Sequence, residues 1–120
     1  MKKIFLLLSV FIFSCASSPS IFLSEGESVI KAKPGKTFSV KLTSQLSTGY
    51  SWKITEIPQD MAVIKEIIRT EESEKTGGFD IQEFVFKSNK SGGIIVFKYG
   101  EHWKQNPSYI KTARILVQAE

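Results

Sequence analysis

The sequence predicts an all-β fold, an immunoglobulin-like β-sandwich of about seven or eight strands. Short apolar or alternating runs recur at about the 8–12-residue spacing of sandwich strands, and Gly, Pro, Asn and Ser collect between them. Apart from one ambiguous segment, no part of the sequence has a helical pattern, and no internal repeat is present. The chain has a single cysteine, so no disulfide can join its strands, and an apolar core must stabilise the domain.

The first half of the chain supplies four of these runs. Residues 21–23 and 29–32 are short and rich in β-branched or aromatic side chains. Residues 33–36 read K-P-G-K, a strong turn signal, because Pro presets φ and Gly accepts positive φ. Residues 37–43 alternate polar and apolar side chains, as a half-buried strand does, and residues 52–57 resume this pattern after a polar loop.

Residues 61–68 are ambiguous between a helix and a strand. Their apolar positions 63, 64, 67 and 68 fit helical spacing, whereas the abundance of β-branched side chains favours a strand. We expect a strand, because every neighbouring run is one. The remaining strand-like runs are 79–87, 93–99 and 109–118, and residues 88–92 have the composition of a turn.

The N-terminus reads as a secretory signal. M-K-K is followed by an apolar stretch to Phe13 that is too short for a membrane-spanning helix of roughly 20 residues. Residues 12–15, I-F-S-C, resemble a bacterial lipoprotein box, in which cleavage precedes a Cys that is then acylated. This resemblance implies a signal peptide over 1–14, an acylated Cys15 with a tether over 15–24, and one domain over 25–120. The alternative is an ordinary signal peptide with an incidental Cys15 at its end.

Acylation at Cys15 would anchor the exported protein to a membrane. We therefore expect an exported lipoprotein at the periplasmic or cell-surface side. Removal of Lys2 and Lys3 lowers the net charge from +4 to +2, and the remaining Lys and Arg residues are scattered, so we expect no nucleic-acid binding. The processed chain would have no free thiol, and His102, the only histidine, has no plausible catalytic partner. We therefore expect a monomeric protein that is not an enzyme and that holds no metal or cofactor.

The loop between the third and fourth runs carries the most informative motif. Residues 47–52 read S-T-G-Y-S-W, which resembles the end of N-P-T-T-G-[YF]-x-W, the first binding loop of chagasin-type inhibitors of papain-like cysteine proteases. Gln45 and Leu46 stand where that pattern has Asn and Pro. Without Pro the loop is expected to be looser, and Leu46→Pro to tighten binding. Taken alone, the segment also fits a hairpin loop beside a core Trp.

A second segment, residues 74–79, partly fits the Gly-rich loop of the same family. Of its G-x-G-G pattern, Gly77 and Gly78 remain, and Lys75 stands where the first Gly would be. The strand that follows, 81–87, resembles the aromatic-rich strand of the family. The alternative is a flexible turn after a charged run.

The third segment, residues 99–103, reads Y-G-E-H-W where the family has Y-x-R-P-W. Tyr99 and Trp103 match in type and spacing, whereas Glu101 and His102 replace Arg and Pro. These replacements remove a positive charge and a rigid residue from the loop. The alternatives are that Trp103 caps one end of the sandwich and that His102 is an ordinary surface residue.

All three matches occur in the family's order, which implies a reversible proteinaceous inhibitor that wedges three loops into the active-site cleft of a papain-like cysteine protease. The resemblance implies that residues 47–49 enter the protease cleft deepest and that Trp103 stacks on an aromatic residue beside the cleft. The residues expected to bind the protease are Ser47, Thr48, Gly49, Tyr50, Trp52, Gly77, Gly78, Phe79 and Trp103. The alternative function is that of a non-inhibitory immunoglobulin-like lipoprotein with a structural or ligand-binding role.

Overall fold

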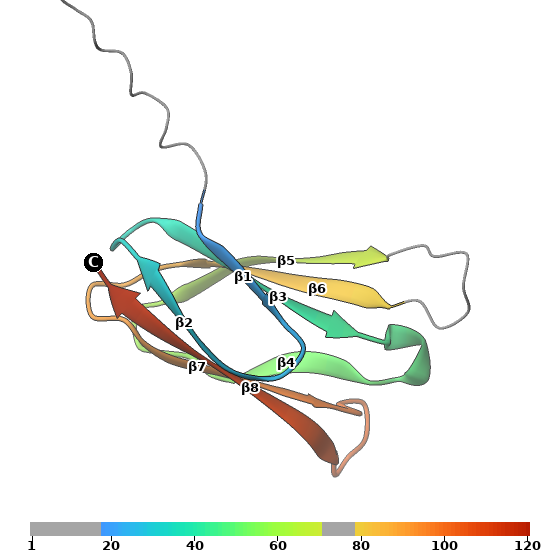
Figure 1. The fold of residues 1–120 in the computed structure, drawn as a ribbon. Helices are drawn as coiled ribbons and strands as arrows, with labels where there is room; N and C mark the ends of the chain where they lie inside the picture. The colour runs from blue at the N-terminus through green and yellow to red at the C-terminus, as the bar shows by residue number, and fades with distance from the viewer. Residues whose placement is uncertain (1–17, 71–78) are drawn as a thin grey trace, which may run out of the picture.

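The computed structural model describes residues 18–70 and 79–120 and has eight strands in two four-stranded sheets (Figure 1). The prediction of an all-β sandwich is confirmed. One sheet has the order β1-β3-β6-β5 and the other the order β2-β8-β7-β4. Their bounds are β1 (Ser20–Leu23), β2 (Gly26–Ala32), β3 (Thr37–Ser44), β4 (Ser51–Glu56), β5 (Ala62–Thr70), β6 (Asp80–Lys87), β7 (Gly93–Gly100) and β8 (Tyr109–Ala119).

The first two strands join different sheets. β1 pairs in parallel with β3, Ser20 opposite Ser39, and β2 pairs in parallel with β8, Gly26 opposite Ala113. Residues 20–23, which fall within the expected tether, are therefore part of a sheet. The backbone of these residues is ordered as a strand, and not as a tether, because it hydrogen-bonds along β3. This hydrogen bonding extends to Pro19, whose carbonyl accepts the Ser39 N–H at 3.0 Å.

The core lies between the two sheets and follows the alternation of the sequence. In β3 the buried side chains Phe38, Val40 and Leu42 alternate with partly exposed polar ones, because successive side chains of a strand point to opposite faces. Phe38 stacks on Phe86 with ring centroids 5.2 Å apart. Truncating such a phenylalanine to Ala costs about 3–5 kcal/mol in proteins generally.

Residues 61–68 form a strand, as expected. β5 pairs antiparallel with β6 and has a register shift between Val63 and Lys65. It is the edge strand of its sheet, so several of its apolar side chains, among them Ile64 and Ile68, stay exposed. The register shift and the interspersed charged side chains are common ways of protecting an edge from pairing with another chain.

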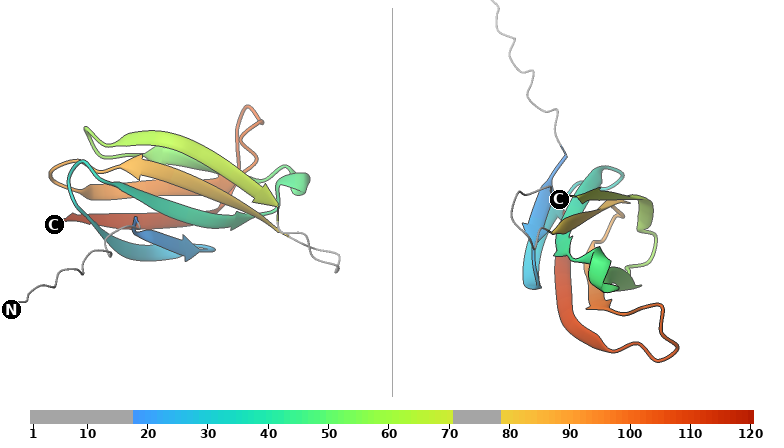
Figure 2. Two further views of the ribbon diagram at one scale, coloured as in Figure 1. Left: turned by 90° about the horizontal axis from the view of Figure 1, so that it is seen from above. Right: turned by 90° about the vertical axis from the view of Figure 1, so that its right-hand side faces the viewer.

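The strand ends that border all three candidate loops lie at one end of the sandwich (Figures 1 and 2). Ser44, Asp80 and Thr70 occupy one line of register across β3, β6 and β5. Ser51 and Tyr109 both pair with Gly100 in the other sheet. Within the described ranges, no helix has the length and apolar character needed to cross a membrane.

Candidate functional site

The first loop, residues 45–50, connects β3 to β4 through the 3₁₀ turn η3 (Leu46–Thr48). Side chains from distant strands hold the start of this turn. The Gln45 N–H donates to the hydroxyl oxygen of Tyr99 at 3.0 Å, and the Leu46 N–H donates to Oδ2 of Asp80 at 2.9 Å. The first N–H groups of a helical turn have no partner within the turn, so these bonds satisfy two donors that would otherwise need water.

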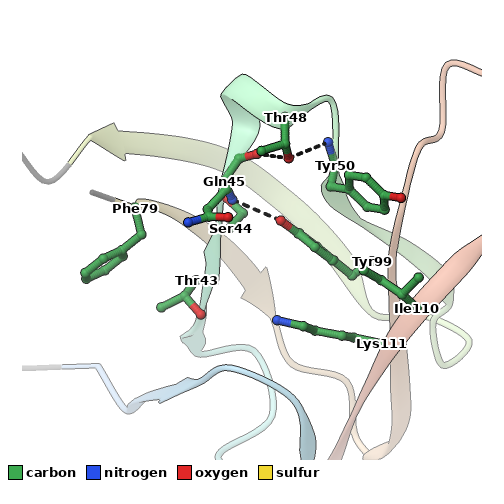
Figure 3. A pocket seen from close by; sticks show the side chains of 9 residues that line it. All are labelled: Thr43, Ser44, Gln45, Thr48, Tyr50, Phe79, Tyr99, Ile110 and Lys111. Atoms are coloured by element: carbon green, nitrogen blue, oxygen red, sulfur yellow. Dashed lines mark hydrogen bonds between the residues drawn. The ribbon is translucent and has the colours of Figure 1, made fainter. Parts of the chain in front are cut away.

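Further bonds close the first loop on itself. The Thr48 hydroxyl donates to the Gln45 carbonyl at 2.6 Å, and Figure 3 shows it between Gln45 and Tyr50. Gly49 ends the turn with φ +87, and its N–H donates to the Leu46 carbonyl at 3.0 Å. A Cβ at Gly49 would lie 3.1 Å from Nε1 of Trp103, so both the backbone conformation and the neighbouring loop favour glycine here.

Trp52 supports the first loop from inside the sandwich. Its side chain is buried, and its Nε1 donates to the Thr43 carbonyl at 2.7 Å. The rings of Tyr50 and Trp52 pack on Tyr99, with centroid distances of 5.6 and 5.0 Å. The structure therefore places Trp52 in the core at the base of the loop, whereas Tyr50 is half-buried and reaches the surface.

Gln82 ties the two sheets together beneath the first loop. Its Oε1 accepts the Trp52 N–H at 2.8 Å, and its Nε2 donates to the Trp52 carbonyl at 3.2 Å and to Oε2 of Glu66 at 3.0 Å. The buried Gln82 amide thus hydrogen-bonds to both the backbone N–H and the backbone carbonyl of Trp52. Because these bonds cross from one sheet to the other, they fix the position at which β4 begins.

The third loop, residues 101–108, presents Trp103, whose side chain is 69% exposed. Oε1 of Glu101 lies 2.7 Å from Nζ of Lys104, and this ammonium lies 5.4 Å from the centre of the Trp103 ring. The Glu101 carboxylate raises the pKa of Lys104, first through the hydrogen bond and then through its charge. The turn is closed by the Lys104 N–H, which donates to the Glu101 carbonyl at 3.1 Å.

His102 connects the third loop to the start of β4. Its Nε2 lies 2.9 Å from the Ser51 carbonyl and 3.1 Å from the Lys98 carbonyl. Both partners are acceptors, so Nε2 carries a proton. The ring is half-buried and packs against Tyr109 with a centroid distance of 5.4 Å. His102 is therefore a structural tie between the two loops rather than an ordinary surface residue.

The second loop lies largely outside the described residues, and with it the expected site residues Gly77 and Gly78. Cys15 and the expected signal peptide also lie outside them. Phe79, where the description resumes, is exposed and lies near the first loop at the rim of a cavity (Figure 3).

That cavity is open, has a volume of about 690 Å³ and lies between the first loop and the start of β8. Thr48 and Tyr50 line it from the first loop, and Ile110 and Lys111 line it from β8. Across residues 18–70 and 79–120, no three or more His, Cys, Asp or Glu side chains come together as a metal site.

Asp80 and Gln82 were not among the residues expected from the sequence. Both stand in a strand whose other inward residues, such as Phe84 and Phe86, are buried and apolar. Gln82 shares that inward face, so a polar residue in phase with the buried aromatics is the sequence signal that points to it. Asp80 stands in the same phase at the start of the strand, but nothing in the sequence identifies its partner, the backbone N–H of Leu46.

The sequence between Lys31 and Val117 matches the family model described as Chagasin family peptidase inhibitor I42. The matched residues cover most of the chain and include the first and third loops described above. The chain belongs to the chagasin family. This membership agrees with the expectation that the protein is an inhibitor and not an enzyme. No curated protein matches the chain.

Solved structures of similar fold include other inhibitors. The cysteine protease inhibitor EhICP2 from Entamoeba histolytica superposes with a TM-score of 0.69, at 18% identity, over 86% of this chain and 97% of that one. PbICP-C, solved in complex with falcipain-2, has a TM-score of 0.57 at 20% identity, over 86% of this chain and 100% of its own. Amebosin has a TM-score of 0.54 at 17% identity, over 85% and 99%. At these identities the likeness shows the fold shared by these chains.

Proposed function

We propose that this member of the chagasin family is a reversible inhibitor of papain-like cysteine proteases and that its loops occupy the active-site cleft. The observation that carries the proposal is the construction of the first loop. Its exposed tip consists of small residues, Ser47 and Thr48, followed by Gly49, while its base is hydrogen-bonded to three strands of the sandwich, β3, β6 and β7. Small side chains allow the backbone to approach the floor of a narrow cleft.

Preorganisation explains how such a loop gains affinity. A loop that is already ordered loses little conformational entropy on binding, so more of the contact energy appears as affinity. The complex of the neighbour PbICP-C with falcipain-2 supports a protease as the partner. An inhibitor interface of ordinary size buries roughly 1,600 Å² in total, which three adjacent loops can supply.

The expected binding residues then take different roles. Ser47, Thr48 and Gly49 enter deepest, and the exposed Trp103 stacks on an aromatic beside the cleft. Gly77, Gly78 and Phe79 lie along the opposite wall. Tyr50 contacts the protease at the edge of the first loop, whereas the buried Trp52 acts by holding that loop in place.

Inhibition of papain tests the proposal directly. The chain from residue 18 onward retains the Pro19 carbonyl that bonds to Ser39, so it contains every described strand. We expect competitive, reversible inhibition, with the inhibitor recovered uncut by mass spectrometry after long incubation. A covalent adduct, cleavage between Ser47 and Tyr50, or no inhibition at micromolar concentrations would contradict the proposal.

We further propose that the protein is an exported, monomeric lipoprotein, anchored to a membrane through acylated Cys15 after removal of residues 1–14. Support comes from the charged, apolar and I-F-S-C segments of the N-terminus. Cys15→Ser should abolish partitioning into a detergent phase and leave the fold unchanged, since the domain uses no thiol. Wild-type protein without acyl mass, recovered wholly in the aqueous phase, would contradict the anchor.

A further inference from the structure

The cavity beside the first loop is lined by Ser44 and Lys111. Among the described residues, the hydroxyl of Ser44 has no hydrogen-bond partner and the ammonium of Lys111 has no carboxylate partner. Ser44, the last residue of β3, is 3% exposed. Buried hydroxyl groups are nearly always hydrogen-bonded, because an unpaired one lowers stability. Ser44 lines the cavity, so a group bound there could satisfy it after one rotation about the serine Cα–Cβ bond.

Lys111, in β8 of the other sheet, is the second of these residues. It shares the inward face with Ala113, Ile115 and Val117, all of which are buried. Its ammonium lies 5.2 Å from the centre of the Tyr99 ring, and no described carboxylate lies within 4.0 Å of it. Figure 3 shows the side chain extending from β8 into the cavity, toward Thr43 of the opposite sheet.

The walls of the cavity limit what it can bind. Lys111 is the one charged residue among its described lining residues, and the nearby Asp80 carboxylate is bonded to the Leu46 N–H instead. Phe79, Tyr50 and Ile110 supply apolar surface at the rim. A single cation with hydroxyl groups beside it matches one carboxylate better than a multiply charged phosphate. The volume of about 690 Å³ is within the range of ligand pockets.

We propose that this cavity binds a carboxylate carried on an apolar group, with Lys111 as the charge partner and Ser44 as a hydrogen-bond donor. The carboxylate can come from an acidic side chain of a docked protease or from a small free organic acid. Thr48 and Tyr50 belong both to the first loop and to the cavity wall, so an occupant also contacts whatever that loop binds. The protease source rests on the proposed function, whereas the free-acid source does not.

The test uses the whole chain as purified from expressing cells, with 3-phenylpropionate as the probe and its neutral amide as the matched control. Amide NMR shifts of Ser44 and Lys111 report binding. We expect a dissociation constant of about 1 mM or tighter for the acid and binding at least about tenfold weaker for the amide. Lys111→Met should weaken binding of the acid about tenfold. Ser44→Ala should weaken it by a smaller factor without lowering the melting temperature.

Lys98→Met is the matched control variant. Lys98 is also half-buried and lies 5.5 Å from the centre of a tyrosine ring, that of Tyr109, but it does not line the cavity. Equal effects of Lys111→Met and Lys98→Met on the acid titration, or equal binding of acid and amide, overturn the proposal. Absence of acid binding also overturns it.

Inhibition of papain by the same variants identifies the source of the carboxylate. A higher inhibition constant for Lys111→Met than for Lys98→Met supports an acidic side chain of the protease. Equal inhibition constants, together with acid binding that depends on Lys111, support a free organic acid. If the wild-type chain binds the acid but does not inhibit papain, the proposed function fails while the carboxylate site stands.

Discussion

The first and third loops lie beside each other at one end of the sandwich, yet the structure holds them in different ways. The first loop is bonded to side chains from other strands, Asp80 in β6 and Tyr99 in β7. The third loop is held mainly by its own neighbours, through the Glu101–Lys104 ion pair and the backbone bond that closes the same turn. Among the described residues, His102 is the one side chain of the third loop that hydrogen-bonds to strands, through the carbonyls of Ser51 in β4 and Lys98 in β7.

This difference shows how a loop can stay ordered without the prolines of the family pattern. Where the pattern has Pro in the first loop, Leu46 uses its N–H to bond to the scaffold. Where it has Pro in the third loop, the His102 ring bonds to two backbone carbonyls. Hydrogen bonds thus replace ring stiffness in both loops, but only the first loop is anchored at several points on the sandwich.

Trp103→Ala should have the largest effect among the four variants that probe this comparison. The side chain is exposed, so its loss should leave the melting temperature nearly unchanged. If Trp103 stacks on the protease, binding to papain should weaken by about 1–3 kcal/mol, roughly 5- to 150-fold. Phe22→Ala, which removes another exposed aromatic, in β1 and outside the three loops, is the control and should bind like wild type. Equal affinities for the two variants would remove Trp103 from the interface.

Asp80→Ala tests the anchoring of the first loop. Loss of the carboxylate leaves the Leu46 N–H without its partner, so the loop should loosen and binding should weaken about tenfold. Asp80→Asn keeps an oxygen acceptor and should restore most of the affinity. Hydrogen exchange at the Leu46 amide gives an independent measurement, and faster exchange in Asp80→Ala alone is the expected result. Unchanged exchange in Asp80→Ala would show that this bond does not order the loop.

Leu46→Pro should weaken binding a few-fold, whereas the family pattern taken alone suggested tighter binding. The reason is that proline has no N–H to donate to Asp80, and the carboxylate would lose its partner. Leu46→Ala keeps the N–H and is the matched control, with an expected affinity close to wild type. Tighter binding by Leu46→Pro would mean that ring stiffness outweighs the hydrogen bond.

Lys104→Met should have the smallest effect, at most about threefold on binding, because exposed ion pairs contribute little. The Glu101 carboxylate raises the pKa of Lys104, so the contribution of the pair is complete below the ordinary pKa of lysine and is lost as pH rises through the raised value. Binding measured across neutral pH should therefore show no step from this pair. A step near pH 7 that disappears in Lys104→Met would contradict this assignment.

Much of the fold could be predicted from alternation alone. Each of the eight strands overlaps an apolar or alternating run, because one face of every strand packs against the core. The sequence predicts a strand-like run at residues 21–23 but places it in the tether, because the pairing of β1 with β3 that joins it to the sandwich has no local signal. The tips of the first and third loops were predicted from short motifs, which are local in sequence.

The anchors of these loops could not be predicted in the same way. Asp80 reaches Leu46 only because β3 and β6 pair in the register that sets Ser44 opposite Asp80. The cavity with Ser44 and Lys111 likewise depends on how two sheets face each other. Such contacts are products of register and sheet packing, and a single sequence carries little local signal for either.

If the first loop enters the protease cleft deepest, added bulk at its tip should block binding. Thr48→Trp and Gly49→Trp should both abolish binding, but each also disturbs the loop. Thr48 loses the bond to the Gln45 carbonyl, and Gly49 has positive φ and lies against Trp103. Ser47 is exposed and makes no side-chain hydrogen bond among the described residues, so Ser47→Trp adds bulk with the least damage to the fold.

The most direct measurement is the dissociation constant for papain of Ser47→Trp compared with Ser91→Trp. Both serines are exposed loop residues, so the two substitutions are chemically identical. They differ in position, because the two serines lie at opposite ends of the sandwich (Figure 1). Circular dichroism and melting temperature first establish that both variants are folded. Ser47→Trp should weaken binding about 100-fold or more, as expected for a blocked interface centre, while Ser91→Trp should bind like wild type. Equal affinities for the two variants would show that the first loop does not enter the active site.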